Sequence, residues 1–269
     1  MSAGRSYALL ALLFCLLASI VRADPPRVAI VIDDVGFQWQ IDQRALLLDR
    51  SVAVAIIPEG PLASDLARKA GVQGREVWAH LPLPGLNQDN CESGLTCLEP
   101  GWGPLTMRNH LIRQLAMVPG AVGINNHQGS RFTSDGRAVT RLVNAIELVN
   151  RERARPLIVM DSRTSPHSKL AQIARRGGLS TLSRRVFLDH SDDPADLSPA
   201  WRRLIALAHR HGSAVAIGHS RAATLDFLEL AIDDLVAEGI DLVPPSALVD
   251  GARSSAIRAA GRATSAYQP

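Results

Sequence analysis

Seven short polar groups in the sequence carry side chains of the kinds that bind metals or move protons. Each group directly follows an apolar run. The groups are Asp33-Asp34, Pro58-Glu59, His80, Asn126-His127, Asp161-Ser162, Asp189-His190 and His219. Two or three neutral imidazoles with a carboxylate form a ligand set that suits Zn²⁺ and leaves a position open for water. With a carboxylate as base and an imidazole as acid nearby, such a set predicts hydrolysis of an amide or ester.

The stretch VAIVIDDVGF, residues 28–37, shows how these groups are presented. Its continuous apolar run, mostly β-branched, indicates a strand buried on both faces, as in a parallel sheet. Asp33 and Asp34 then lie at the carboxyl end of the strand, which is the edge where α/β folds build active sites. Two adjacent carboxylates repel each other unless a cation or hydrogen-bond donors lie between them. The alternative is a simple turn in which one Asp caps the next helix.

The same unit of strand and helix recurs along the chain. Further apolar runs start near residues 52, 76, 121, 157, 186 and 214, and segments with helical spacing separate them. Strand and helix alternate about seven times, which predicts an α/β fold with a parallel sheet closed, or nearly closed, into a barrel. The carboxyl ends of parallel barrel strands meet at one rim, so the seven polar groups are expected to converge there.

The amino end resembles a secretory signal peptide. Arg5 precedes an apolar run over residues 8–21, and small residues lie before Asp24. We therefore expect a signal peptide over residues 1–23, with an uncleaved anchor as the alternative. One large domain over residues 24–250 and a flexible tail over residues 251–269 would follow. The mature protein is expected to be periplasmic or secreted, without stable membrane insertion.

The charge balance argues against a polyanionic partner. The chain has 29 Lys and Arg against 26 Asp and Glu, and two of the arginines lie in the expected signal peptide. The mature chain is therefore close to neutral, and we expect no nucleic acid partner. The arginines are scattered along predicted helix faces, which favours a solvated surface.

Two cysteines lie in the longest irregular segment, residues 85–103. Cys91 and Cys97 occur in CESGLTC. In an oxidising compartment this spacing suits a disulfide that closes a small loop, and two free thiols are the alternative. A loop of this length in a compact domain is usually functional.

Six motifs together resemble one enzyme family. They are IDDVG, EVWAHLPLPG, GINNHQGSRFTSD, MDSRT, FLDH and AIGHS, in this order over nearly the whole mature chain. The set resembles the divergent polysaccharide deacetylases, a branch of the NodB-like carbohydrate esterases. The resemblance implies a distorted (β/α) barrel, a divalent metal, with Zn²⁺ as the expected ion, and removal of N- or O-acetyl groups from a cell-envelope or extracellular glycan. By position, Asp33 matches the catalytic base, Asp34 and His80 match metal ligands, and His219 matches the general acid.

The sequence departs from the main branch of these esterases at the second metal histidine. That residue is expected four positions after His80, where this chain has Pro84. His127 is the candidate for the missing ligand. The arginine motif of the main branch is not recognisable either, and Arg131 or Arg163 could replace it.

Further polar residues are assigned to substrate binding or to the support of metal ligands. They are Asn126, Ser130, Asp161, Ser162 and Asp189. Capping of turns and helices is the alternative for the hydroxyl and carboxylate members of this set. Two functions therefore stay open: a metal-dependent deacetylase, and a carbohydrate-binding or envelope-maintenance protein that keeps the barrel without turnover. Pro84 in place of a ligand histidine favours the second.

Overall fold

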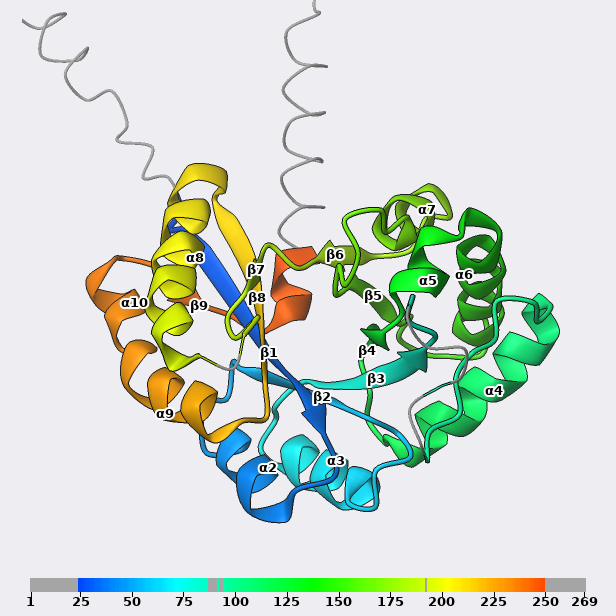
Figure 1. Cartoon of the computed structure of the whole chain (residues 1–269), viewed down its shortest axis with the longest axis horizontal. Coiled ribbons are helices and arrows are strands. Elements are labelled where there is room, and N and C mark those ends of the chain that lie inside the picture. Colours follow the sequence, from blue (N-terminus) through cyan, green and yellow to red (C-terminus); the bar gives the residue numbers. More distant parts are fainter. Residues whose placement is uncertain (1–23, 87–90, 92–93, 192, 250–269) are drawn as a thin grey trace, which may run out of the picture.

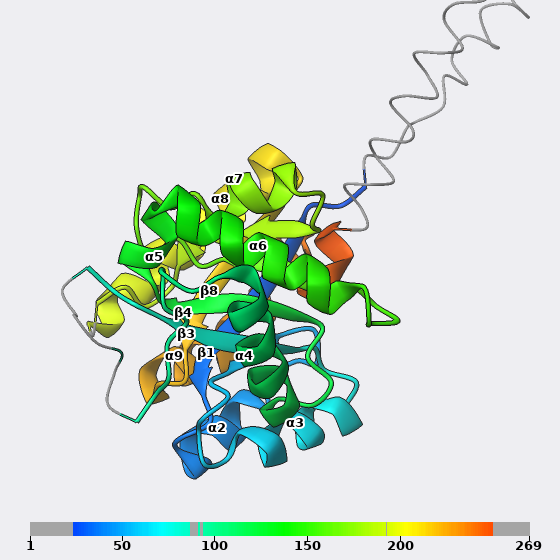
Figure 2. The same cartoon turned by 90° about the vertical axis from the view of Figure 1, so that its right-hand side faces the viewer.

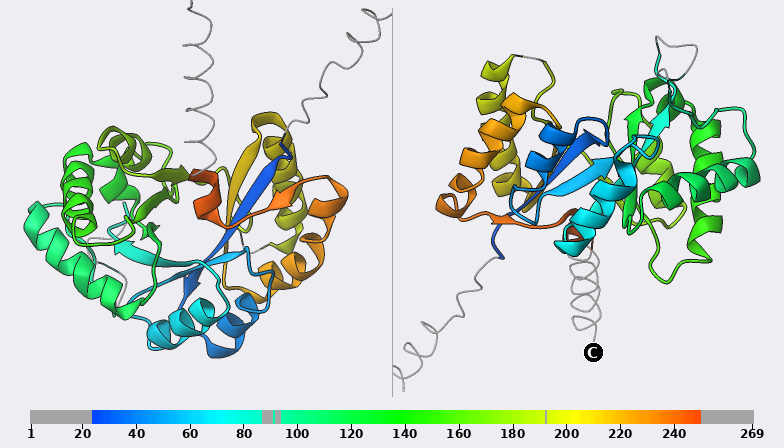
Figure 3. Two further views of the ribbon diagram at one scale, coloured as in Figure 1. Left: turned by 180° about the vertical axis from the view of Figure 1, so that it is seen from behind. Right: turned by 90° about the horizontal axis from the view of Figure 1, so that it is seen from below.

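The computed structural model describes residues 24–86, 91, 94–191 and 193–249. Within these residues, eight parallel strands form one curved sheet in the order β6-β5-β4-β3-β2-β1-β8-β7, and β9 pairs with β1. Figures 1 and 3 show the sheet curled into a distorted barrel with helices around its outside. The strands are β1 (Arg27–Val35), β2 (Ala53–Ile56), β3 (Val77–Leu83), β4 (Gly123–Gln128), β5 (Ile158–Asp161), β6 (Thr181–Ser183), β7 (Val186–Phe187), β8 (Ser213–His219) and β9 (Asp241–Leu242). The predicted α/β barrel is confirmed.

The number of strands in the barrel differs from the expected seven. The strand that sequence patterning missed is β6, because its three residues include one apolar side chain, Leu182, and show no periodicity. It pairs with β5 alone, and at the other end of the sheet β7 pairs with β8 alone. The barrel is therefore open between β6 and β7, although only two residues connect these strands.

Strand β1 lies at the centre of the sheet and is buried on both faces. Its residues 28–32 have no exposed surface. Val28, Ile30 and Ile32 pack toward the outer helices, whereas Ala29 and Val31 pack inside the barrel. Period-two alternation between two apolar environments explains why the run contains no polar residue.

The helices cover the outer face of the sheet, and Figure 2 shows α4 and α6 side by side. Asp135 caps α6, since its side chain accepts from the amides of Arg137 and Ala138. The hydroxyl of Ser134, the residue before this cap, donates to the Ser130 carbonyl. The helical segments are α2 (Trp39–Ala45), α3 (Ala63–Val72), α4 (Pro104–Met117), α5 (Ser130–Ser134), α6 (Gly136–Asn150), α7 (Leu170–Arg176), η1 (Pro194–Asp196), α8 (Leu197–His211), α9 (Ala222–Ala231) and α10 (Asp234–Ala237).

Apolar side chains fill the inside of the barrel below the carboxyl-end rim. Trp78 is fully buried there, and Leu248 and Val249, which follow β9, belong to the same cluster. A Cβ atom at Gly123 would lie 2.5 Å from the Trp78 ring, so the neighbouring strand must carry glycine at that position. The interior around Trp78 is thus a packed core, and the candidate catalytic side chains gather above it at the rim.

The expected signal peptide, residues 1–23, and the expected tail, residues 251–269, lie outside the described residues. Among the described residues, no helix has the length and apolar character needed to span a bilayer.

Candidate active site

A cavity of about 350 Å³ lies at the carboxyl ends of the strands. Five of the seven polar groups that the sequence placed after separate strands meet in its lining, together with Phe187 of β7, whereas Pro58-Glu59 and Asp189-His190 do not line it. Seven of the candidate residues line it: Asp33, Asp34, His80, Asn126, His127, Ser162 and His219. The remaining candidates, Ser130, Asp161 and Asp189, lie outside this lining.

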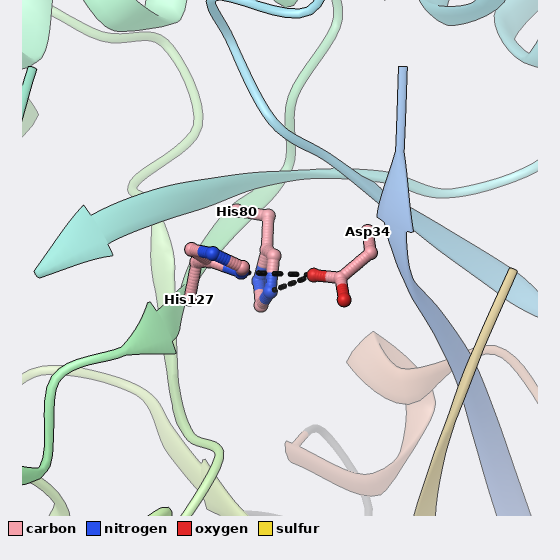
Figure 4. A group of neighbouring side chains, drawn as sticks. All are labelled: Asp34, His80 and His127. Atoms are coloured by element: carbon pink, nitrogen blue, oxygen red, sulfur yellow. Dashed lines mark hydrogen bonds and ion pairs between the residues drawn. The ribbon is translucent and has the colours of Figure 1, made fainter. Parts of the chain in front are cut away.

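Asp34, His80 and His127 form a cluster that could hold a metal ion. One ligand atom from each lies within 4.8 Å of the others. The Asp34 Oδ1 atom is 2.9 Å from His127 Nδ1 and 3.2 Å from His80 Nε2, and Figure 4 shows both imidazoles directed at this oxygen. Ligand atoms in a tetrahedral site with bonds near 2.0 Å are separated by about 3.3 Å. The spacing and the N/O chemistry of the three groups therefore fit a divalent cation.

An irregularity in β1 turns both adjacent carboxylates toward the cavity. Neighbouring residues of a regular strand point to opposite faces. The register of β1 against β2 shifts between Ile32 and Val35, and Asp34 has a left-handed backbone with φ of 61°. Bulges of this kind redirect side chains beside active sites, and Asp tolerates the left-handed region better than most residues.

Asp42, rather than either residue of the pair, caps the turn that follows β1. Its Oδ2 atom accepts from the amides of Gly36 and Gln38, each at 2.9 Å. Its Oδ1 atom accepts from the Ser220 hydroxyl at 2.6 Å, which joins this turn to the one after β8. The sequence alternative, in which Asp33 or Asp34 caps the next helix, is therefore not seen in the described contacts.

Asn125 connects the base candidate to a metal-ligand candidate. It is 2% exposed, its Nδ2 atom donates to Asp33 Oδ1 at 2.8 Å, and its Oδ1 atom lies 2.8 Å from His80 Nδ1. Because an amide oxygen can only accept, His80 carries a proton on Nδ1 and directs its Nε2 atom at Asp34. Sequence reasoning selected Asn126 and missed Asn125; the period-two rule, applied from His127 along β4, would have indicated it.

We expect Asn125→Ala to weaken metal binding about 10- to 100-fold, because it removes the group that orients a ligand imidazole. It should also lower the free energy of unfolding by about 1–3 kcal/mol, since buried polar atoms on two residues lose a partner. Asn126→Ala is the matched control. Asn126 bonds the Ser162 amide and the Gln128 carbonyl, so its loss should destabilise the fold without affecting the metal. Chelator competition and denaturant unfolding measure the two quantities, and equal metal affinities for both variants would contradict the assignment.

His219 is oriented by Asp189. The Asp189 carboxylate accepts from the His219 Nδ1 atom and from the His219 backbone amide, both at 2.8 Å, and from the Thr224 hydroxyl at 2.6 Å. The His219 Nε2 atom then faces the cavity, 3.8 Å from Asp34 Oδ2. Burial would lower the pKa of His219, but the bond to Asp189 outweighs burial and raises it.

The electrostatics of the rim favour a positive charge between the carboxylates. Burial raises the pKa of Asp33. Burial acts in the same direction on Asp34, but hydrogen bonds with His127 and His80 hold the pKa of that carboxyl well below its usual range. Burial would lower the pKa of His80, yet the charges of Asp33 and Asp34 raise it. Either a proton or a metal cation bound between these carboxylates and imidazoles would supply that positive charge.

The other candidates mainly support the backbone around the rim. Asp161 accepts from the Arg163 amide at 2.8 Å, the Ser168 hydroxyl at 2.8 Å and the Ala171 amide at 3.2 Å, as turn and helix caps do. The Ser130 hydroxyl accepts from the Leu86 amide at 2.9 Å. Turn capping, the alternative that the sequence left open, describes the contacts of Asp161. Ser130 instead holds the chain just after β3, 44 residues away in the sequence.

A disulfide joins Cys91 and Cys97, with Cα atoms 5.5 Å apart. The loop lies against β3, because the Leu98 amide donates to the Pro82 carbonyl at 3.2 Å. Glu59, expected at the rim, instead accepts from the Thr96 amide at 3.1 Å. Its carboxylate therefore braces the loop beside the strand that carries His80.

Comparisons with known proteins agree with this architecture. A protein from Haemophilus influenzae described as uncharacterized is 35% identical over 217 residues, which cover 81% of this chain and 74% of the relative. The uncharacterized protein YibQ of Escherichia coli is 34% identical over 224 residues, which cover 83% of this chain and 67% of the relative.

Solved structures share the fold. The structure of an uncharacterized protein from Agrobacterium tumefaciens superposes with a TM-score of 0.76 at 23% identity, covering 84% of this chain and 90% of that one. A mutant of a CE4 family pseudoenzyme with restored enzymatic activity superposes with a TM-score of 0.51 at 14% identity, covering 84% of this chain and 68% of that one. A sequence model described as divergent polysaccharide deacetylase matches residues 30–249. Because this match covers most of the sequence, the chain belongs to the divergent polysaccharide deacetylase family.

Proposed function

We propose that this protein is an exported, metal-dependent hydrolase that removes N- or O-acetyl groups from a cell-envelope or extracellular glycan. The observation that carries the proposal is the cluster of Asp34, His80 and His127, with the candidate base Asp33 and the candidate acid His219 beside it in one cavity. Family membership supports a polysaccharide substrate. Export rests on the signal peptide expected over residues 1–23, followed by a catalytic domain over residues 24–250.

Asp34, His80 and His127 would hold the metal, with Zn²⁺ as the expected ion. When bound, it would supply Lewis-acid polarisation of the acetyl carbonyl and of water. Asp33 would take a proton from the attacking water as its oxygen bonds to the acetyl carbon. His219 would donate a proton to the leaving nitrogen or oxygen as the bond to the acetyl carbon breaks. Acetate and a free amine or hydroxyl result, and the protons balance.

Asp189 gives the proposed acid its pH range. An acid catalyst must be protonated, and a raised pKa keeps the His219 imidazolium present at higher pH than a free imidazole would allow. Burial would raise the pKa of Asp189, but the bond to His219 outweighs burial and lowers it, so the carboxylate stays ionised and supports the imidazolium.

Asp189→Asn should move the alkaline limb of the kcat profile to lower pH, because removing the carboxylate lowers the pKa of the acid. Activity measured above neutral pH should therefore fall more than activity at pH 6. Asp193→Asn is the matched control, since Asp193 is exposed and its contacts cap the short helix η1. An unchanged alkaline limb in Asp189→Asn would show that His219 is not the acid or that Asp189 does not tune it.

A second candidate function is carbohydrate binding without turnover. Pro84 stands where the main branch has a ligand histidine, and a CE4 family pseudoenzyme shares the fold. Metal analysis of the purified protein, followed by an acetate-release assay on acetylated amino-sugar polymers, separates the two functions. Release of acetate that depends on the bound metal supports the hydrolase. Stoichiometric metal with no release from any acetylated glycan would favour the binding protein.

A further inference from the structure

A second and larger cavity, of about 840 Å³, lies at the opening between the two ends of the sheet. We call it the seam cavity. Its walls are residues 178–185 around β6, the start of β8 at residues 213–215, and Leu248 and Val249. In Figure 1 the red segment that follows β9 lies between β6 and β8. The catalytic proposal does not use this cavity.

Four arginines line the seam cavity, and none of the described residues in its lining is Asp or Glu. They are Arg163, Arg175, Arg184 and Arg185. Sequence patterning interpreted the arginines as scattered over a solvated surface. Arg163, Arg175 and Arg185 are exposed, but the fold gathers them with the half-buried Arg184 around one hollow, because the chain segments after β5, in α7 and after β6 meet at the seam.

The positive charge of the seam cavity is not neutralised within the described part of the chain. None of the four guanidinium groups there forms an ion pair, whereas Arg44, Arg68 and Arg108 elsewhere each pair with a carboxylate. The Arg175 Nη2 atom donates to the Ser183 hydroxyl at 3.4 Å, and Arg184 donates to two backbone carbonyls. These contacts position the side chains through neutral partners and form no direct ion pair.

The electrostatic state of Arg184 indicates the sign of a ligand. Burial and the neighbouring guanidinium of Arg163 lower the pKa of Arg184, and the more distant charges of Asp33 and Asp161 offset only part of this effect. A bound anion would reduce the repulsion between these neighbouring positive charges. Guanidinium groups form bidentate hydrogen bonds with carboxylate and phosphate oxygens. The hydroxyls of Ser180, Thr181 and Ser213 in the lining could bond sugar hydroxyls.

The seam cavity shares a wall with the active-site cavity. The Arg184 Nη2 atom donates to the Arg163 carbonyl at 2.7 Å, and its Nε atom donates to the Ser162 carbonyl. Its guanidinium carbon lies 4.5 Å from the centre of the Phe187 ring. Ser162 and Phe187 both line the active-site cavity. The two cavities therefore lie on opposite sides of the contacts that Arg184 makes.

We propose that the seam cavity binds an anionic segment of the glycan, so that the substrate carries carboxylate or phosphate groups near the acetylated sugar. The part of this proposal that concerns acetylated sugar rests on the proposed function. Residues 1–23 and 251–269 contain arginines and no Asp or Glu, so neither of these terminal segments complements the cavity in charge. A separate anionic molecule is the better match.

Isothermal titration calorimetry of the full chain at low salt tests the proposal. The probes are hexagalacturonate, which has a carboxylate on each sugar, neutral chitohexaose, and inorganic phosphate. Arg163→Gln/Arg185→Gln removes two exposed charges from the seam, and Arg137→Gln/Arg155→Gln removes two exposed charges elsewhere. Hexagalacturonate should bind the seam variant about five- to tenfold more weakly than wild type, and the control variant within about twofold. Chitohexaose should bind all three proteins alike.

Three results would overturn the anionic-segment proposal. They are no binding of hexagalacturonate, equal weakening in the two double variants, and phosphate binding as tight as that of the hexamer, which would indicate a site for a free oxyanion. Acetate release is measured separately. If acetate is released from neutral oligomers but hexagalacturonate does not bind, the deacetylase function stands and the anionic site is ruled out. If hexagalacturonate binds in an arginine-dependent way but no glycan releases acetate, the anionic site stands and the deacetylase function is ruled out.

Discussion

Asp34→Asn and His127→Ala should each be purified without stoichiometric metal, and acetate release should fall to background in both. The cluster has one oxygen and two nitrogen ligands from the protein, and a set this small does not hold its ion after losing a member. The effect should be largest for Asp34, because its Oδ1 atom faces both imidazoles. Metal content after zinc saturation and desalting, measured by mass spectrometry, gives the result.

His167→Ala is the matched control for the histidine variant, because His167 is exposed and lies outside the cavity lining. It should keep wild-type metal content. The informative case is His127, which the sequence offered as a replacement for the histidine missing at Pro84. Wild-type metal content in His127→Ala would show that another group completes the set, even though His127 lies 2.9 Å from Asp34.

Asp33→Asn should keep the metal and lower turnover about 10²- to 10⁴-fold, the usual contribution of a general base. The substitution preserves shape, and the Asn125 amide can still donate to the remaining oxygen that it now contacts at 2.8 Å. What disappears is the ability to accept a proton. The burial that raises the pKa of Asp33 also predicts a better base, since a higher pKa means stronger proton affinity once the group is ionised.

Measuring metal content and kcat for Asp33→Asn and Asp34→Asn side by side separates the two carboxylates. The proposed roles require loss of turnover alone in the first variant and loss of metal in the second. If Asp33→Asn empties the site while Asp34→Asn stays loaded, the roles are reversed. If neither variant changes metal or turnover, the pair shapes the turn after β1 and has no part in catalysis.

Long-range pairing decided several features that no local pattern encodes. Whether Asp33 and Asp34 share a face depends on the register of β1 against β2, since an unbroken strand would separate them. Asn125 gains its role because its partners, Asp33 on β1 and His80 on β3, come together through the sheet. In β6, pairing with β5 compensates for the weak local signal of three residues.

Alternation of buried strands and amphipathic helices was readable in the sequence, because a strand covered on both faces must be apolar throughout. For the same reason, polar residues directly after such a strand had to lie at the carboxyl-end rim, which predicted Asp33, Asp34, His80, His127 and His219 as neighbours. Distances, side-chain directions and the opening between β6 and β7 were not readable, since they depend on how strands far apart in the chain pair and twist. The gathering of arginines at the seam belongs to this second class: residue spacing records which side chains exist, whereas the curvature of the sheet decides which of them face the same cavity.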